Sequence, residues 1–360
     1  MKFNFPMTKP MLIPYINEKG NAISIGGFQQ NIARDLEVDN PEFFLEFLKY
    51  LNGKNSFEDI KNKFDLDNEL CEEILESLLE NGVIQENEKI FDFSKEEYEY
   101  YSRNINFFSW IDIKGIYYNY WEVQNILKNS KVLLLGAGGT GSINAINLVR
   151  LGIGSVTIVD YDVVDTSNLN RQNFFYEDIG KLKVEALKNH LNRINPFISI
   201  NIINKKIETL SDILEIKVDF DIVICCIDKP DNVLEIMEEY TSITKIPRIL
   251  GGYASTIISH SIFKDNTHSY TNTKDNIINN HFDSKNVDKN DFWKWDNAVI
   301  PMVANIAGSF ATLNAFYYLT KLNILRDGII HHIDLYNLQS NAFSYYIGEN
   351  GVLNMEDKTI

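Results

Sequence analysis

Lys131-Val-Leu-Leu-Leu-Gly-Ala-Gly-Gly-Thr-Gly141 is the stretch of sequence that decides the fold. Four apolar residues follow Lys131 without interruption, which is typical of a strand buried on both faces of a parallel sheet. Gly136, Gly138 and Gly141 then form a G-x-G-x-x-G motif. Glycines at this spacing permit a tight turn and let backbone N–H groups approach a phosphate at the beginning of a helix. The stretch therefore predicts a strand, a phosphate-binding loop and a helix over residues 142–151.

The residues that follow this stretch alternate between strand and helix patterns. Further buried strands are predicted at 155–160, 221–226 and 248–251, and helical periodicity extends over 302–322. Such alternation predicts an α/β fold built on a doubly wound, mostly parallel Rossmann-like sheet.

Two segments depart from the parallel pattern. Residues 332–347 alternate apolar and polar side chains around Ser340-Asn341, which predicts an antiparallel hairpin that turns there. Residues 264–297 are rich in Asn, Asp, Lys, Ser and Thr, which indicates a long insertion. The insertion either covers the ligand groove, with Trp293 and Trp295 as contacts, or is a solvated loop.

Residues 1–92 are interpreted as a separate, winged-helix-like α+β domain, and residues 93–130 as an aromatic-rich linker with packing helices. The third predicted helix of the first domain, over 70–79, is acidic and would repel the phosphates of DNA. A protein or peptide partner is therefore favoured over DNA, and a structural cap without a ligand is the alternative. The domain is assembled from a hairpin around Asn17-Glu-Lys-Gly20, helices that begin at Asn40-Pro41, Ser56 and Leu70, and a terminal wing at Val83-Ile84.

Composition excludes several classes of protein. The 360 residues include 50 acidic and 34 basic side chains, a formal net charge of -16, which argues against non-specific nucleic-acid binding. No apolar stretch approaches the ~20 residues of a membrane helix, and the beginning of the chain lacks the apolar core of a signal peptide. The 3 cysteines include no C-x-x-C pair, so neither a disulfide framework nor zinc is predicted. We expect a cytoplasmic protein of two or three domains.

Asp160 closes the second buried strand, 19 residues after Gly141. A carboxylate at this place suits the two hydroxyls of a ribose. Asp160 and the glycine loop together predict a nucleotide site. The alternative is a purely structural role, in which the glycine turn packs on the sheet and Asp160 caps a helix or turn. An NAD-dependent oxidoreductase would share both features.

Three polar residues beyond this strand favour a triphosphate instead. Asn168 and Arg171 follow in Ser167-Asn-Leu-Asn-Arg-Gln172, and Lys183 begins the next predicted helix. Arginine grips phosphate oxygens bidentately and lysine acts as a point charge, so the pair would neutralise a triphosphate during group transfer. Asp228, at the end of another strand, is either a ligand to Mg²⁺ or the cap of the following helix.

These motifs, in this order and spacing, resemble the ThiF/MoeB/E1-type adenylating enzymes over about residues 100–325. The resemblance implies that Gly136, Gly138, Gly139, Gly141 and Asp160 bind ATP. It also implies that Asn168, Arg171 and Lys183 handle the phosphates, and that Asp228 serves Mg²⁺ and catalysis. Enzymes of this family adenylate a carboxylate, usually at the C-terminus of a small protein or peptide. They are typically homodimers in which each subunit donates an arginine to the other's ATP, and Tyr101-Ser-Arg103-Asn104 matches that segment, which makes Arg103 the candidate.

The subgroup most similar to this chain is the one named for the microcin C7 enzyme MccB. Its members carry an N-terminal, PqqD-like peptide clamp, and residues 1–92 have the size and element order of such a clamp. The resemblance implies that this domain binds a leader peptide as a strand added to a sheet edge. Residues 131–360 would then form the adenylation domain.

The chain also departs from the family pattern. The two zinc-binding C-x-x-C pairs of the family are missing, and no cysteine follows Cys226. Zinc is therefore not expected, and transfer of the substrate to a cysteine thioester is disfavoured.

Three functions are consistent with these observations. The leading hypothesis is an ATP-dependent adenylyltransferase that activates a carboxylate of a ribosomally made precursor peptide, with MccB-like nucleotide transfer as one outcome. The first alternative is a non-catalytic protein that delivers a leader peptide to another enzyme. The second is an NAD-dependent oxidoreductase, which leaves Asn168, Arg171 and Lys183 unexplained.

Overall fold

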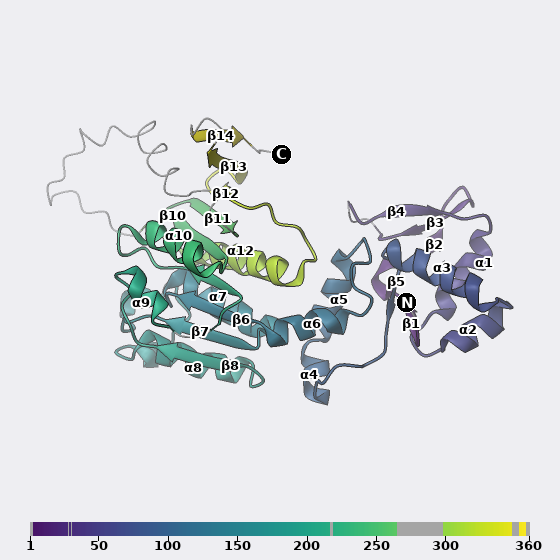
Figure 1. The fold of residues 1–360 in the computed structure, drawn as a ribbon, viewed down its shortest axis with the longest axis horizontal. Helices are drawn as coiled ribbons and strands as arrows, with labels where there is room; N and C mark the ends of the chain where they lie inside the picture. Colours follow the sequence, from purple (N-terminus) through teal and green to yellow (C-terminus); the bar gives the residue numbers. More distant parts are fainter. Residues whose placement is uncertain are drawn as a thin grey trace. The chain divides into compact units, whose positions relative to one another are not determined.

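The computed structural model describes residues 3–27, 29, 31–216, 219–264, 298–347 and 353–357. The chain divides into two compact units, Met1–Ile126 and Leu127–Ile360, each with its own hydrophobic core (Figure 1).

The second unit is built on one large sheet, and its described strands follow the order β14-β13-β12-β11-β10-β9-β6-β7-β8. Neighbours from β10 to β8 run parallel, and neighbours from β10 to β14 run antiparallel. The predicted doubly wound, mostly parallel sheet is confirmed. Its strands are β6 (Lys131–Leu135), β7 (Ser155–Val159), β8 (Ser199–Ile203), β9 (Ile222–Cys225), β10 (Arg248–Ala254), β11 (Ile257–Phe263), β12 (Ile329–Asp334), β13 (Gln339–Ile347) and β14 (Leu353–Asp357).

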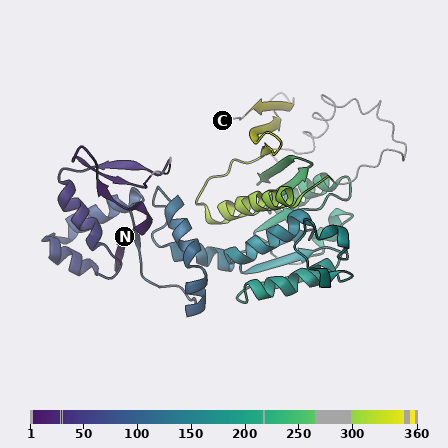
Figure 2. The same cartoon turned by 180° about the vertical axis from the view of Figure 1, so that it is seen from behind.

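Helices cover both faces of this sheet (Figures 1 and 2). On one face α7 (Gly139–Leu151) packs against α8 (Lys183–Ile194) and α12 (Pro301–Thr320). A buried hydrogen bond of 2.8 Å from the Thr312 hydroxyl to the Asn144 side-chain oxygen joins α12 to α7. On the other face α9 (Leu210–Leu214) and α10 (Val233–Thr244) enclose a cluster with the apolar side chains of β6 and β9. Because β6 and β9 are interior strands that are covered on both faces, they carry the continuous apolar runs seen in the sequence.

Strand order places a crevice beside β6. The chain winds from β6 through β7 to β8 on one side, and then returns to β9 and β10 on the other. In such sheets, ligands bind outside the carboxyl ends of the strands at the point where the winding reverses. The glycine loop after β6 lies at this point.

The first unit contains two small sheets and several helices. One sheet pairs β1 (Pro6–Thr8) with β5 (Ile84–Glu86), and the other has the order β2 (Tyr15–Ile16), β3 (Ala22–Ile25) and β4 (Arg34–Glu37). Asn40 caps the first helix through its side chain, as predicted, and Ser56 caps the second, at the predicted beginning of that helix. Asp67 caps the third helix, which begins at Asn68 and not at the predicted Leu70. The helices are α1 (Pro41–Tyr50), α2 (Phe57–Phe64), α3 (Asn68–Glu80), α4 (Lys95–Tyr100), α5 (Ser102–Ile111) and α6 (Tyr120–Asn129), in which the boundary between the units falls.

Buried polar contacts attach residues 93–126 to the first unit. The Lys9 ammonium donates to the Asp112 carbonyl at 2.8 Å, and the Ser109 hydroxyl donates to the Gln85 side-chain oxygen at 2.7 Å. Burial lowers the pKa of Lys9 to about 8. The division into 1–92, 93–130 and 131–360 stays a prediction, and residues 93–126 cluster with the first of these ranges.

The C-terminal hairpin differs from the prediction in where it turns. Strands β12 and β13 pair antiparallel, with Asp334 opposite Gln339, so the turn is at residues 335–338. Ser340 and Asn341 lie in β13, and the prediction that the chain turns there was wrong. Leu338 instead adopts the left-handed conformation, with φ 59°, which apolar residues rarely do and which the composition of the segment does not reveal.

Two further expectations concern parts of the chain outside these elements. The insertion predicted at 264–297 lies outside the described residues except for Lys264, and so do Trp293 and Trp295. Among the described residues, no helix is both long and apolar enough to cross a lipid bilayer.

Candidate active site

A cavity of about 820 Å³ lies at the carboxyl ends of the parallel strands of the second unit. Five consecutive strands of the sheet, β8, β7, β6, β9 and β10, contribute residues at or just after their ends. Seven of the residues predicted from the sequence line it: Gly136, Gly138, Gly139, Asp160, Arg171, Lys183 and Asp228.

The loop between β6 and α7 requires glycine for steric reasons. Gly136 has φ +98°, and a Cβ there would lie 2.9 Å from Ile227 Cγ2 and 3.0 Å from the Cys226 carbonyl oxygen. A Cβ on Gly141 would lie 2.0 Å from the carbonyl oxygen of Gly136, so the beginning of α7 touches the loop that precedes it. Gly138 is the N-cap of α7 and has no side chain that could accept hydrogen bonds from the N–H groups of the first helical turn. These N–H groups can therefore bind an anion.

Asp160 follows β7 and is held against the glycine loop. One carboxylate oxygen accepts the Ala137 N–H at 2.6 Å, and the other accepts the Asp162 N–H at 2.8 Å. Each carboxylate oxygen can accept a second hydrogen bond, which matches the two hydroxyl donors of a ribose.

Lys183 is the first residue of α8, and its side chain is 7% exposed. Its ammonium lies 2.7 Å from Asp162 Oδ2, and its backbone N–H donates to the Asp162 carbonyl at 2.9 Å. Because the partner carboxylate is 45% exposed, the cation is held in place at the cavity wall without being sealed from it.

Arg171 enters the cavity from the turn after the 3₁₀ helix Thr166–Asn168. Its guanidinium donates to the Ser167 carbonyl at 2.8 Å and to the Asn170 side chain at 2.9 Å. Asn168 is not among the residues that line the cavity. Its side chain accepts the Asp165 N–H at 3.0 Å and its carbonyl accepts the Arg171 N–H at 3.1 Å, so it shapes the turn that presents Arg171.

Asp228 lies at the cavity wall beyond the end of β9 and is exposed. It does not cap the following helix, because α10 begins at Val233 and its N-cap is Asn232. Its carboxylate is therefore not used by the helix and can face a ligand.

Several polar residues that line this cavity are not predicted from the sequence, among them Gln172, Lys205 and Lys206. Gln172 is 8% exposed, and its side-chain oxygen has no hydrogen-bond partner among the described residues. Its side-chain nitrogen lies 4.0 Å from the position of a Cβ on Gly138, so the amide is next to the glycine loop. The place of Lys205 and Lys206 directly after β8 is the signal that identifies them, since strand ends meet at the ligand edge.

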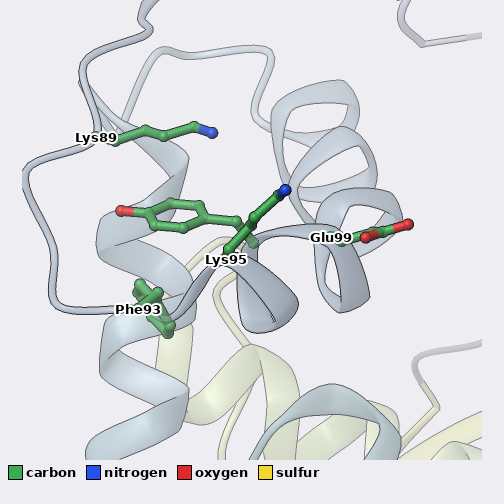
Figure 3. A pocket seen from close by; sticks show the side chains of 5 residues that line it. Lys89, Phe93, Lys95 and Glu99 are labelled. Atoms are coloured by element: carbon green, nitrogen blue, oxygen red, sulfur yellow. The ribbon is translucent and has the colours of Figure 1, made fainter.

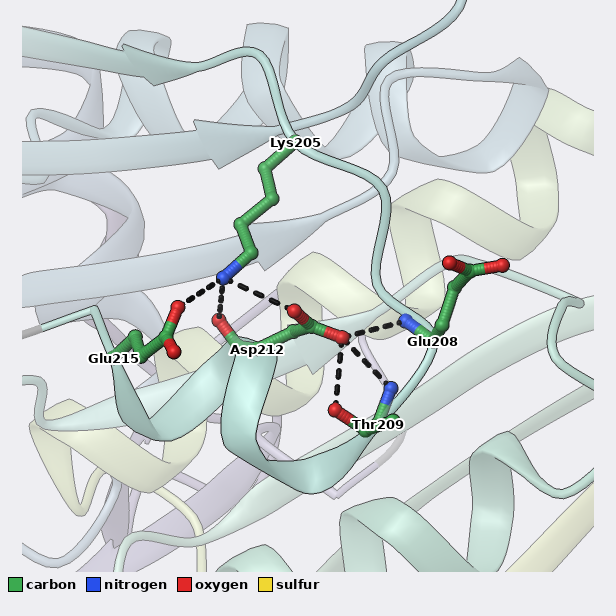
Figure 4. Close-up of polar contacts among 5 residues, drawn as sticks. All are labelled: Lys205, Glu208, Thr209, Asp212 and Glu215. Carbon is green, nitrogen blue, oxygen red and sulfur yellow. Dashed lines mark hydrogen bonds and ion pairs between the residues drawn. The ribbon is translucent and has the colours of Figure 1, made fainter.

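Lys205 has carboxylate partners of its own (Figure 4). Its ammonium lies 2.6 Å from Glu215 Oε2 and 3.1 Å from Asp212 Oδ1. Asp212 also accepts N–H groups from Glu208 and Thr209, and these bonds lower its pKa. These contacts hold the loop between β8 and α9 in place. The positive charge of Lys205 is balanced by two carboxylates, whereas that of Lys183 is balanced by one.

Two other features lie in the first unit. A cavity of about 480 Å³ is lined by Lys89, Phe93, Lys95, Tyr98 and Glu99, with the Lys89 ammonium 4.5 Å from the centre of the Tyr98 ring (Figure 3). None of the predicted site residues lines it. Arg103 is exposed on α5.

Comparison with known proteins shows which proteins this chain is similar to. Residues 101–345 match the ThiF family. The adenylyltransferase and sulfurtransferase UBA4 of Candida glabrata is 37% identical over 155 residues, which are 42% of this chain and 34% of UBA4. The molybdopterin-synthase adenylyltransferase of Haemophilus influenzae is 34% identical over 163 residues, 45% of this chain and 63% of the relative. The chain thus spans about a third of the length of UBA4 and less than two thirds of the length of the second relative.

The fold is also that of a solved protein over nearly its whole length. A crystal structure of Escherichia coli MccB with ATP superposes with a TM-score of 0.69 at 20% identity, covering 98% of this chain and 96% of MccB. Another structure of the same protein contains AMPCPP and MccA.

Proposed function

The chain belongs to the ThiF family, and from this premise we propose that it is an ATP-dependent adenylyltransferase that activates a carboxylate of a ribosomally made precursor peptide. The observation that carries the proposal is the single cavity that gathers the glycine loop, Asp160, Arg171, Lys183 and Asp228. A dinucleotide site uses the loop and the carboxylate but has no need of the two cations, whereas a triphosphate does.

The reaction follows from the chemistry of these groups. An oxygen of the substrate carboxylate, already ionised at pH 7, attacks the α-phosphorus of ATP in line. The bond from that phosphorus to the bridging oxygen breaks, and pyrophosphate leaves with the electron pair. No proton is transferred, so the site needs no general base. Arg171 and Lys183 stabilise the negative charge that grows on the pyrophosphate, while Asp160 and the glycine loop hold the nucleoside end.

Asp228 suits Mg²⁺ in its donor type and exposure. Among the described residues, no group of three or more His, Cys, Asp and Glu side chains gathers as a metal site. Mg²⁺ characteristically takes one or two carboxylates and completes its shell with phosphate oxygens and water. Asp228 would therefore hold the ion together with the triphosphate, and the ion would supply neutralisation of phosphate charge.

A peptide substrate is supported by the extent of the likeness to MccB. The likeness includes the first unit as well as the adenylation fold, and MccB is known in complex with the precursor peptide MccA. In this proposal the first unit, which provides an exposed strand edge at β4, binds the leader peptide. The UBA4 of Candida glabrata and the molybdopterin-synthase adenylyltransferase of Haemophilus influenzae match 42% and 45% of this chain, and their names support the activation chemistry.

We further propose that the enzyme is a homodimer in which Arg103 acts on the partner's ATP. Arg103 is exposed on α5, where a partner subunit can reach it. An arginine at the triphosphate adds positive charge where the leaving group develops negative charge.

Peptide-dependent exchange of labelled pyrophosphate into ATP tests the proposal. The full chain is incubated with ATP, Mg²⁺ and the peptide encoded by a short reading frame beside its gene. Exchange that depends on the peptide supports adenylation, and mass spectrometry of the peptide then identifies the product. Peptide binding without exchange would instead establish a delivery protein, and tighter binding of NADH than of ATP would establish a dinucleotide enzyme.

A further inference from the structure

The first unit carries a second large groove, of about 1000 Å³, between β4, the beginning of α1 and one face of α3. Its floor is apolar. Phe43 from α1 is 39% exposed and Leu70 from α3 is 45% exposed, so both apolar side chains present surface to the groove. The other large apolar residues that line the groove are Leu36, Val38, Phe44, Ile74 and Leu78.

The groove runs along an open sheet edge. In the sheet β2-β3-β4, the outer side of β4 has no strand partner among the described residues. Its backbone N–H and C=O groups can therefore pair with an extended segment from outside. Side chains of a segment added in this way alternate between the two faces of the sheet.

The lining of the groove along this edge is also acidic. Asp35, Glu37 and Asp39 alternate with Leu36 and Val38, and all of them line the groove. Glu73 adds a fourth carboxylate from α3, and no lysine or arginine is among the lining residues. Asp35 accepts a hydrogen bond of 2.6 Å from the Ser24 hydroxyl. Within the described part of the chain, Glu37, Asp39 and Glu73 have no ion-pair partner.

We propose that this groove binds an extended peptide in which apolar side chains alternate with lysine or arginine, and that it selects the precursor by this pattern. The apolar side chains would face Phe43 and Leu70, while the basic ones would face Glu37 and Asp39. The inference rests on the proposed function and adds to it the chemical class of the leader. A second copy of this chain is a poor occupant, because its net charge is -16.

Fluorescence anisotropy with defined probes tests the proposal. The full chain is titrated with two short labelled peptides, one alternating leucine with lysine and the other alternating leucine with glutamate. The lysine peptide should bind at least about tenfold tighter, and the difference should shrink as salt rises from about 0.05 to 0.5 M. Equal affinity of the two peptides overturns the proposal, as does failure of both to bind.

Charge variants locate the site. Neutralising two groove carboxylates together, with Glu37→Gln and Glu73→Gln, should weaken the lysine peptide by roughly three- to tenfold. The matched control is Glu72→Gln, an exposed glutamate of the same helix that does not line the groove, which should change affinity less than about twofold. Reversal with Glu37→Lys and Glu73→Lys should invert the preference. An unchanged preference in the reversed variant would place the binding elsewhere.

These measurements are independent of adenylation, because they contain no ATP. Charge-selective binding without pyrophosphate exchange would leave this inference standing and contradict the proposed enzyme. Pyrophosphate exchange with a genomic peptide whose affinity is unchanged by the Glu37 and Glu73 variants would support the proposed enzyme and contradict this inference.

Discussion

Two lysines at the same cavity have different surroundings, and the difference predicts different roles. Lys183 is 7% exposed and has one carboxylate partner, whereas Lys205 lies between Asp212 and Glu215. We expect Lys183→Gln to lower pyrophosphate exchange by about a hundredfold, because in the proposed reaction the lysine charge stabilises the leaving pyrophosphate. Lys205→Gln is the matched control and should change exchange by less than about fivefold. Similar losses in both variants would indicate that the cavity responds only to total charge.

The glycine loop allows a stability prediction at one residue. A Cβ on Gly141 would overlap the Gly136 carbonyl oxygen, at 2.0 Å, so Gly141→Ala must push the loop away from α7. We expect a loss of about 1–3 kcal/mol in the free energy of unfolding, measured by urea denaturation. Gly252→Ala is the control, because nothing lies within 4 Å of its Cβ position. A loss at Gly252 as large as that at Gly141 would contradict the steric argument.

At the scale of elements, the packing of α12 on the antiparallel strands buries a histidine. His260 of β11 stacks on Phe310 of α12 at 4.6 Å and on His331 of β12 at 4.9 Å, and the Asn314 amide lies 3.1 Å from its Nδ1. Burial lowers the pKa of His260 to about 4, and also lowers the pKa of His331 and His332. The folded state therefore favours the neutral form of the His260 imidazole.

The sign of the pH dependence follows from this shift. Between pH 6.5 and 4, His260 binds a proton in the unfolded chain but not in the folded chain. The contribution of the neutral His260 to stability is therefore complete above pH 6.5 and falls as the pH drops. The loss attributable to His260 should reach about 3 kcal/mol near pH 4. Urea denaturation of the parent and of His260→Gln at several pH values measures it, and the variant should show the shallower dependence. Parallel curves for the two proteins would assign the acid sensitivity to other groups.

At the scale of the whole molecule, the proposed exchange of Arg103 between subunits has a direct test. Arg103→Ala and Lys183→Ala should each inactivate the enzyme alone. In a mixed dimer, the subunit that keeps Lys183 receives Arg103 from its partner, so one of the two sites is complete. Random mixing should then restore roughly a quarter of parental exchange activity. A mixture as inactive as its components would show that Arg103 acts within its own subunit or not at all.

Local patterns were sufficient for much of the fold. The apolar run after Lys131, the glycine spacing and the caps at Asn40 and Ser56 are statements about neighbours in sequence, and the structure confirms the elements they predict. The C-terminal hairpin shows the limit, because its turn depends on the pairing of Asp334 with Gln339 and not on the polar pair Ser340-Asn341. Propensity alone placed the turn at the wrong residues.

The sequence by itself determined the class of sheet, the glycine loop and its carboxylate, and the membership in a family, because each is encoded in short-range order along the chain. Only the tertiary structure decided which residues share a cavity. In the folded chain Lys183 pairs with Asp162, and Asn168 supports the turn of Arg171 without lining the cavity. The cavity is also lined by Gln172, Lys205 and Lys206. The fold also aligns the carboxylates of β4 with Glu73 of α3 along one groove. The physical reason is that strand order and helix packing join residues far apart in sequence, and these contacts leave no periodic signal in the chain.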